Sequence, residues 1–182
     1  MKVLRVLIAV VLCSSPLLFA QQDRLHLGPV PAACGDLDQS MVVQLDNSQH
    51  AIAQPETGKA LVYFIQDTGM LLGARGYPTM RFGVDGKWVG ANKRDSYFSI
   101  AVAPGEHHLC AALQSGLLTG NLNKRRVTLA HFTAEAGKVY FYRTKLTFSD
   151  ITLEYLDLSP ADSDEARYLI ETFPLSTAHA KK

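Results

Sequence analysis

The side chains that could carry out acid–base or metal chemistry in this chain are scattered along the sequence. His107 and His108 are adjacent, and neighbouring residues of a strand point to opposite faces, so the two rings cannot share a metal ion. His131 has no acidic or sulfur-containing neighbour in the sequence. We interpret these histidines as polar residues of strands, and we expect no metal site and no cofactor.

Catalysis by a triad is an alternative that the sequence leaves open, because triads assemble from distant positions. Asp95, Ser96 and His107 supply the three residue types, but nothing selects them over any other trio. The sequence contains no Gly-x-Ser-x-Gly elbow, no His-Glu-x-x-His and no phosphate-binding glycine loop that ends in Lys-Ser or Lys-Thr. We therefore predict that the protein is not an enzyme and has no catalytic residues, with an unrecognised hydrolase as the less favoured alternative.

Aromatic side chains could serve binding instead, because rings on one face of a sheet can stack on sugars or anchor a protein partner. Trp88 follows the turn Asp85-Gly86, so we expect its ring near a hairpin tip and predict a contact edge of Asp85, Lys87 and Trp88. The alternative is that the rings fill the core and cover the edge of the fold. The rings considered are Tyr63, Tyr77, Trp88, Tyr97, Tyr140 and Tyr142.

The first 20 residues have the layout of a secretory signal peptide. Lys2 and Arg5 precede an apolar run, and small or apolar residues lead to Ala20. We expect cleavage after Ala20 and a periplasmic or secreted protein; an uncleaved anchor helix is the alternative. Cys13 follows Leu12, where lipid attachment needs a small residue, so we expect no lipidation.

The other two cysteines, Cys34 and Cys110, remain after cleavage. An even number of cysteines in an oxidising compartment predicts a disulfide, whereas two unpaired thiols are the alternative. A bond between them would close a long loop and contribute about 4 kcal/mol in the chain-entropy model.

Length and charge limit the class of protein. The chain has 182 residues, which suits one domain with a substantial core. Of its 18 Lys and Arg residues, Lys2 and Arg5 are lost with the leader, which leaves 16 against 17 Asp and Glu. This balance gives no field for binding nucleic acid, and we expect no transmembrane segment after cleavage.

Turn residues divide the middle of the chain into strands. Asp85-Gly86 suits a two-residue hairpin, and Pro104-Gly105 ends one strand and starts another. The strands expected around them are consecutive and antiparallel: Met80–Val84, Lys87–Gly90, Tyr97–Ala103 and Glu106–Leu113. Further strands are predicted at Leu61–Ile65, Val127–Phe132, Val139–Tyr142 with Lys145–Phe148, and Ile151–Leu156, and a short one at Met41–Leu45. The pattern predicts a mainly β fold, an antiparallel β-sandwich of about seven to eight strands.

One helix is expected after the strands. Ser159 would cap it and Pro160 would be its first residue, and its apolar stripe is Ala166, Leu169, Ile170 and Phe173. We divide the chain into a signal peptide (1–20), an extended N-terminal segment (21–57) that Cys34 pins to the sandwich, a β-sandwich domain (58–157), a C-terminal helix (158–174) and a flexible tail (175–182).

An ordered series of motifs accompanies these strands: Gly58–Tyr63, Val84–Gly90, Ser96–Phe98, Ala103–His107 and Ala136–Phe141. The series resembles a bacterial domain-of-unknown-function family of exported proteins and lipoproteins, and is distantly similar to the PEGA-type domains of envelope proteins. The resemblance covers about residues 58–157. It implies a prealbumin-like β-sandwich in the cell envelope and no established catalytic residues.

These observations lead to an expected function. We expect an uncharacterised, exported, non-enzymatic envelope protein that acts by binding another surface component. A glycan-binding β-sandwich is the alternative. The sequence does not give the partner or the oligomeric state.

Overall fold

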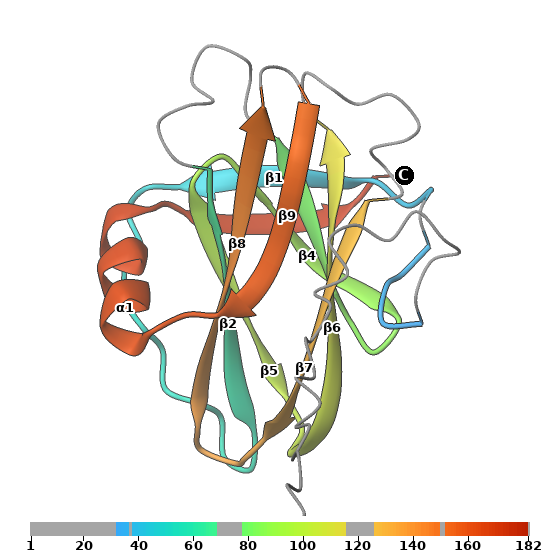
Figure 1. Ribbon diagram of the computed structural model, residues 1–182. Helices are drawn as coiled ribbons and strands as arrows, with labels where there is room; N and C mark the ends of the chain where they lie inside the picture. Colours follow the sequence, from blue (N-terminus) through green and yellow to red (C-terminus); the bar gives the residue numbers. More distant parts are fainter. Residues whose placement is uncertain (1–31, 37, 69–77, 116–125, 150–151, 182) are drawn as a thin grey trace, which may run out of the picture.

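The computed structural model describes residues 32–36, 38–68, 78–115, 126–149 and 152–181. In this part of the chain, two β-sheets pack face to face (Figure 1). The predicted signal peptide and Tyr77 lie outside the described residues. The fold is therefore mainly β, as the turn pattern predicts.

The larger sheet has six strands in the order β1-β10-β5-β2-β8-β9. Their bounds are Met41–Asp46 (β1), Leu175–Ala180 (β10), Ser96–Val102 (β5), Ala60–Asp67 (β2), Val139–Ser149 (β8) and Thr152–Pro160 (β9). The smaller sheet has four strands in the order β4-β3-β6-β7. Their bounds are Lys87–Lys93 (β4), Thr79–Val84 (β3), Gly105–Ser115 (β6) and Val127–Ala134 (β7).

The β-sandwich is confirmed, but it differs from the expected one in two ways. It has ten strands in the described residues rather than seven to eight. The larger sheet is mixed, because β2 pairs with β8 and β10 pairs with β5 in parallel. Both parallel pairs join strands that are far apart in sequence, so the turn residues between consecutive strands could not indicate them.

The predicted corners have different roles. Asp85 and Gly86 have φ values of 49° and 85°, so the pair forms a two-residue hairpin between β3 and β4, as expected. The strands around the other corners are not paired with each other. At Arg94, which has φ of 65°, and at Pro104-Gly105 the chain crosses from one sheet to the other. The run of four consecutive antiparallel neighbours is therefore wrong.

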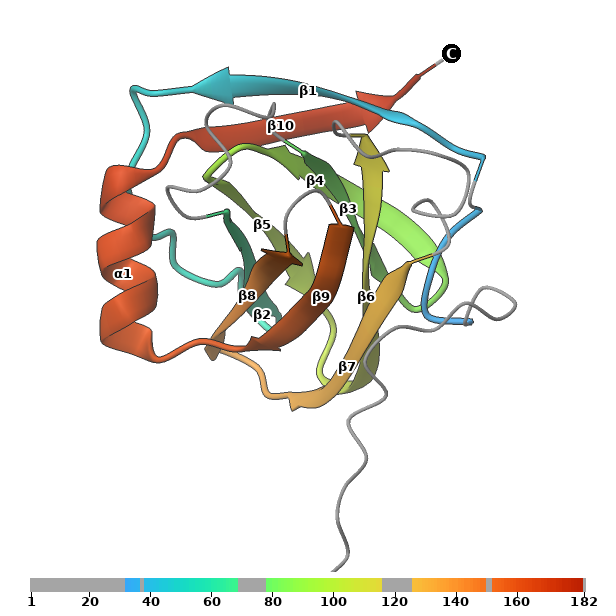
Figure 2. The ribbon, with the colours of Figure 1, turned by 45° about the horizontal axis from the view of Figure 1, so that its top comes forward.

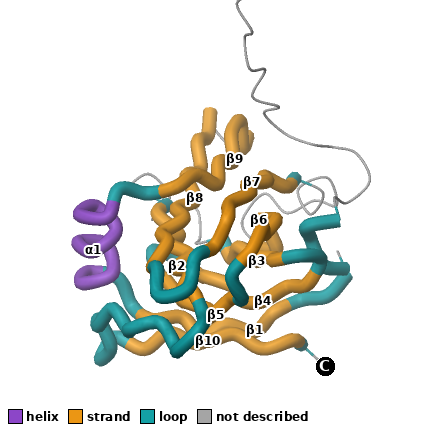
Figure 3. Tube along the Cα trace, turned by 90° about the horizontal axis from the view of Figure 1, so that it is seen from below, coloured by secondary structure: helices purple, strands orange, loops and turns teal. Residues whose placement is uncertain are grey.

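Three apolar clusters hold the layers together. The central one lies between the sheets and includes Phe64, Phe82 and Phe98, whose ring centroids are 5.1–5.5 Å apart. A second lies between the other face of the larger sheet and helix α1 (Ser163–Thr172), which stands beside β8 and β2 in Figure 3. A third covers the outer face of the smaller sheet. Strand β2 is buried on both faces, as its continuous apolar run predicts.

Helix α1 begins later than predicted. Strand β9 continues through Ser159 to Pro160, which pairs with Tyr142 of β8, so Ser159 is not the cap. Asp162 is the cap, and its side chain accepts hydrogen bonds from the amides of Asp164 and Glu165. The predicted apolar stripe does pack on the sheet. Among the described residues, no helix has the length and apolar character that crossing a membrane requires.

The expected flexible tail is instead a strand. Residues Leu175–Ala180 form β10, which pairs along its whole length with β1. The buried Ser176 also donates a hydrogen bond to the Ala91 carbonyl of β4. These partners are distant in sequence, so the short polar segment gave no local sign of its pairing. Figure 2 shows β10 and β1 lying together along one side of the sandwich, with β1 outermost.

Candidate functional site

The N-terminal segment is held on the outer face of the smaller sheet by a disulfide. Cys34 bonds to Cys110 of β6, with the two Cα atoms 5.2 Å apart, and both side chains are buried. The predicted pairing is confirmed. Because Cys110 lies in an inner strand of the sheet, the bond fixes the residues around Cys34 to the middle of that sheet.

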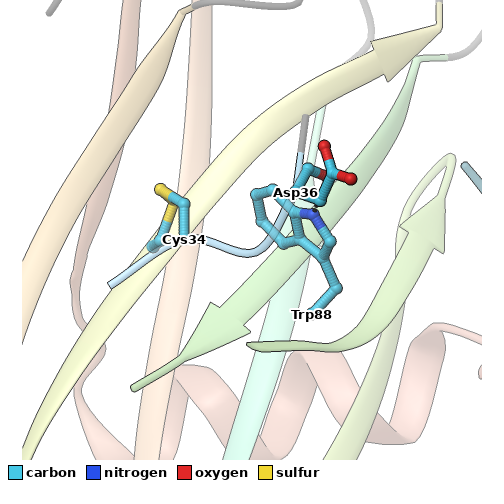
Figure 4. The surroundings of a disulfide bond; sticks show 4 residues. Cys34, Asp36 and Trp88 are labelled. Carbon is cyan, nitrogen blue, oxygen red and sulfur yellow. Dashed lines mark hydrogen bonds between the residues drawn. A yellow bond between two sulfur atoms is a disulfide. The ribbon is translucent and has the colours of Figure 1, made fainter. Parts of the chain in front are cut away.

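Trp88 lies under this segment and is not part of an exposed edge. Its indole N–H donates to the Asp36 carbonyl at 2.6 Å, and Figure 4 shows the indole beside Asp36. A Cβ atom on Gly35 would lie 2.5 Å from the indole, so only glycine allows the segment to approach so closely. Only 8 % of Trp88 is exposed, and the proposed contact edge of Asp85, Lys87 and Trp88 therefore loses its aromatic member.

Arg81 of β3 also holds the N-terminal segment in place. It is 1 % exposed, its guanidinium lies 4.5 Å from the Trp88 ring centroid, and it donates to the Gln39 carbonyl. Burial lowers the pKa of Arg81, whereas the charges of Asp36 and Asp38 oppose that change. The segment that leads into β1 is thus fixed by the Cys34–Cys110 disulfide and by contacts with the Trp88 indole and the Arg81 guanidinium.

A second cluster lies at the Asp85 turn. His107 Nδ1 is 2.6 Å from Asp85 Oδ2, and His107 Nε2 is 2.8 Å from the Ala103 carbonyl oxygen. The His108 amide donates to Asp85 Oδ1, and the Asp85 amide donates to the His108 carbonyl. The turn between β3 and β4 is therefore bound to the start of β6 and to the corner that precedes it.

The pKa values at this cluster favour the charged pair. Burial lowers the pKa of His107, but its hydrogen bonds to Ala103 and Asp85 and the Asp85 charge outweigh this, so the pKa is raised. Burial raises the pKa of Asp85, but the His108 amide and the His107 ring outweigh that effect and lower it. A carboxylate beside an imidazolium is the arrangement that both shifts favour.

This pair does not have the arrangement of a hydrolytic triad. In a triad, one imidazole nitrogen faces the carboxylate and the other faces the nucleophile, but His107 Nε2 faces a carbonyl. Asp95 accepts instead from the Thr68 amide and hydroxyl. Ser96 lies at the start of β5 and His107 beyond its end, so the trio of Asp95, Ser96 and His107 is not assembled.

His108 and His131 face each other across β6 and β7, with ring centroids 6.4 Å apart. His107 instead faces Phe132, at 5.7 Å between centroids. The adjacent histidines thus point to opposite faces, as strand geometry requires. Within the described residues, no three side chains of His, Cys, Asp or Glu are placed to hold a metal ion together.

The outer edge of β1 is a third candidate site. The Lys181 amide donates to the Ser40 carbonyl, so in this antiparallel register Val42, Gln44 and Asp46 direct their backbone groups at β10. The alternate residues Met41, Val43 and Leu45 direct theirs outward. Gln114 of β6 confirms this by binding both the amide and the carbonyl of Met41, at 2.7 and 2.8 Å.

Beyond Met41, no strand in the described part of the chain pairs with this edge, because β1 ends the larger sheet. The strand also has two exposed apolar side chains, Val42 at 38 % and Leu45 at 36 %. It contains no charge before Asp46. Edge strands of soluble proteins usually carry charged residues or proline that prevent pairing with other chains, so β1 is an unprotected edge as far as the described residues show.

Four of the tyrosines that the sequence offered for binding do not form an exposed platform. Tyr63, Tyr97 and Tyr142 are buried and Tyr140 is partly buried. Their hydroxyl groups also serve the fold, since Tyr63 and Tyr97 bind the backbone of Ala53 and Gln49. Glycan stacking would need rings that face solvent, and these four do not provide it.

Comparison with protein families, curated proteins and solved structures found no match. The function of this chain must therefore be inferred from its own geometry.

Proposed function

We propose that this protein is an exported, non-enzymatic envelope protein that binds another surface protein by strand addition at the outer edge of β1. The observation that carries the proposal is the unprotected edge itself. The backbone groups of Val43 and Leu45 pair with no strand among the described residues, and they are the groups that an incoming strand would bind. The resemblance to exported envelope families agrees with this setting.

Export is supported by two independent features. The first 20 residues have the layout of a signal peptide, and the Cys34–Cys110 disulfide is typical of proteins in oxidising compartments. A protein of the envelope meets other envelope proteins, so the partner that we propose is an extended segment of such a protein.

The chemistry of the edge defines the partner segment. Val43 and Leu45 each offer an N–H and a C=O to the incoming backbone. Exposed Val42 and Leu45 favour apolar side chains in that segment, and the lack of charge before Asp46 means that no charged side chain is required. We therefore propose an extended, mostly apolar and uncharged strand.

Other edges of the sandwich are less suited to this role. The β4 edge lies against β10, because Ser176 of β10 donates a hydrogen bond to the Ala91 carbonyl of β4. On the other side of the sandwich, β7 and β9 approach each other although they belong to different sheets. Gln114 closes the Met41 end of β1, so it also limits where an added strand can begin.

Substitutions at the outward-facing positions of β1 test the proposal. Val43→Pro removes an N–H that does not bind β10, and proline is tolerated at edge strands in that orientation. Leu45→Lys places a charge on the edge. Gln44→Lys is the matched control, because the Gln44 backbone binds β10 and its side chain is already exposed.

Short displayed peptides panned on the immobilised wild-type protein serve as the probe. We expect the recovered peptides to be apolar and β-forming, and to lose about tenfold or more in affinity for Val43→Pro and Leu45→Lys, the equivalent of one strong hydrogen bond or contact. Gln44→Lys should bind as the wild type does. Equal binding to all four proteins would contradict the proposal, provided that circular dichroism shows each variant folded.

A further inference from the structure

The cluster at the Asp85 turn has an unusual donor balance. Both ring nitrogens of His107 lie within hydrogen-bond distance of oxygens, one on the Asp85 carboxylate and one on the Ala103 carbonyl. A neutral imidazole has one N–H, whereas an imidazolium has two. A neutral His107 beside an ionised Asp85 can donate only one of these two hydrogen bonds. Both form at the same time only when the His107–Asp85 pair carries one additional proton.

The geometry points to a proton-dependent latch, in which His107 in its doubly protonated form ties the Asp85 turn to the Ala103 corner. We call these three residues the His107 latch. It is separate from the β1 edge and does not depend on the function proposed for that edge.

The latch is connected by hydrogen bonds to neighbouring parts of the fold. Asp85 is also bound to the backbone of His108, and the next residue, Gly86, donates its amide to the Ala33 carbonyl at 3.1 Å. Ala33 adjoins Cys34, whose disulfide fixes the N-terminal segment. Loss of the proton would therefore loosen the turn, the corner and the residues that pack over Trp88.

The surroundings of His107 support this assignment. Its side chain is 13 % exposed, so water cannot easily replace a lost partner, whereas that of Asp85 is 46 % exposed. From β6, Glu106 and His108 are the neighbouring titratable groups, and their side chains lie 3.8 Å apart. From β7, the Phe132 ring packs against His107, and His131 faces His108 rather than His107. Asp85 is thus the charged group in hydrogen-bond contact with the ring.

The direction of the pH effect follows from the two pKa values. The pKa of His107 is raised above its usual 6.5, so the latch is complete below that pH and is lost as the pH rises through the higher folded value. The pKa of Asp85 is lowered from 3.8, so the contribution of its ionised carboxylate to the latch is lost only as the pH falls through that lowered pKa. The latch is therefore closed in mildly acidic surroundings and opens as the pH rises above the raised pKa of His107.

Asp85→Asn is an informative variant because it removes the need for the extra proton. The side-chain amide that this substitution introduces could donate an N–H to a neutral His107 Nδ1, while His107 Nε2–H donates to Ala103. Asparagine also tolerates the left-handed backbone conformation that Asp85 has, with φ of 49°. His131→Gln is the control, since His131 is exposed and does not touch the latch.

Nitrogen-15 NMR of the histidine rings and amide exchange at Gly86 and His108, corrected for intrinsic rates, test the latch over a pH series. In the wild type and in His131→Gln we expect two ring N–H groups on His107 below pH 6.5. We expect both amides to exchange about tenfold faster once His107 is neutral, as for the loss of one charge-assisted bond. In Asp85→Asn, His107 should titrate at lower pH and this acceleration should vanish. One ring N–H on wild-type His107 at acidic pH, or the same acceleration in Asp85→Asn, would overturn the proposal.

Discussion

Removal of the Cys34–Cys110 disulfide is expected to affect the N-terminal segment and the whole fold to different extents. The two residues are 76 positions apart, and a cross-link over such a loop stabilises the folded state by about 4 kcal/mol in the chain-entropy model. With a urea m-value of about 2 kcal/mol/M, the unfolding midpoint should fall by about 2 M on reduction. The sandwich core between the sheets does not include either cysteine, so the reduced protein should still fold.

The single tryptophan of the chain makes this measurement direct. Trp88 lies under Gly35 and Asp36, so release of the segment exposes the indole and shifts its fluorescence to longer wavelength. Urea unfolding is followed by this emission and by far-ultraviolet circular dichroism, with and without reductant. The double variant Cys34→Ala/Cys110→Ala is the control and should not respond to reductant. If the reduced and oxidised wild-type proteins share one midpoint and one emission maximum, the disulfide does not hold the N-terminal segment over Trp88.

Three further changes test the packing, the helix cap and the charge at the turn. Gly90→Ala should lower the free energy of unfolding by about 1–3 kcal/mol, because its Cβ would lie 2.4 Å from the Phe98 ring; calorimetry measures this, and a neutral result would show that the ring can move freely. Asp162→Ala should cost about 1 kcal/mol through loss of the α1 cap; chemical unfolding measures this, and an unchanged midpoint would contradict the cap. Acid unfolding of Asp85→Asn should show less loss of stability than the wild type below pH 3.8, because the ionised Asp85 stabilises the fold only above its lowered pKa; identical acid transitions would refute this contribution.

The sequence could predict the parts of the fold that depend on local chemistry. Asp85-Gly86 indicated the hairpin because both residues adopt positive φ there. The unbroken apolar run of β2 indicated a strand buried on both faces. What local patterns could not indicate is which strands pair: β10 is a short polar segment, and it becomes a strand through its bonds to β1 and β4.

The candidate sites divide in the same way. Cys34 and Cys110 could be paired from the sequence because they are the two cysteines that follow the predicted signal peptide. The sequence offers Asp85 and His107 as separate candidates, but their contact depends on the β3–β6 register, in which Val84 lies opposite Leu109. Trp88 was misplaced because a ring after a turn is exposed unless another segment covers it, and the covering residues lie 52 positions away.

Residue-resolved hydrogen exchange of β1 tests the central claim about its outer edge most directly. We predict alternation: the amides of Val42 and Gln44, which face β10, should be protected, and those of Val43 and Leu45 should exchange rapidly in the protein alone. Protection of Val43 and Leu45 equal to that of Val42 and Gln44 would contradict the account, since it would mean that the edge is already paired.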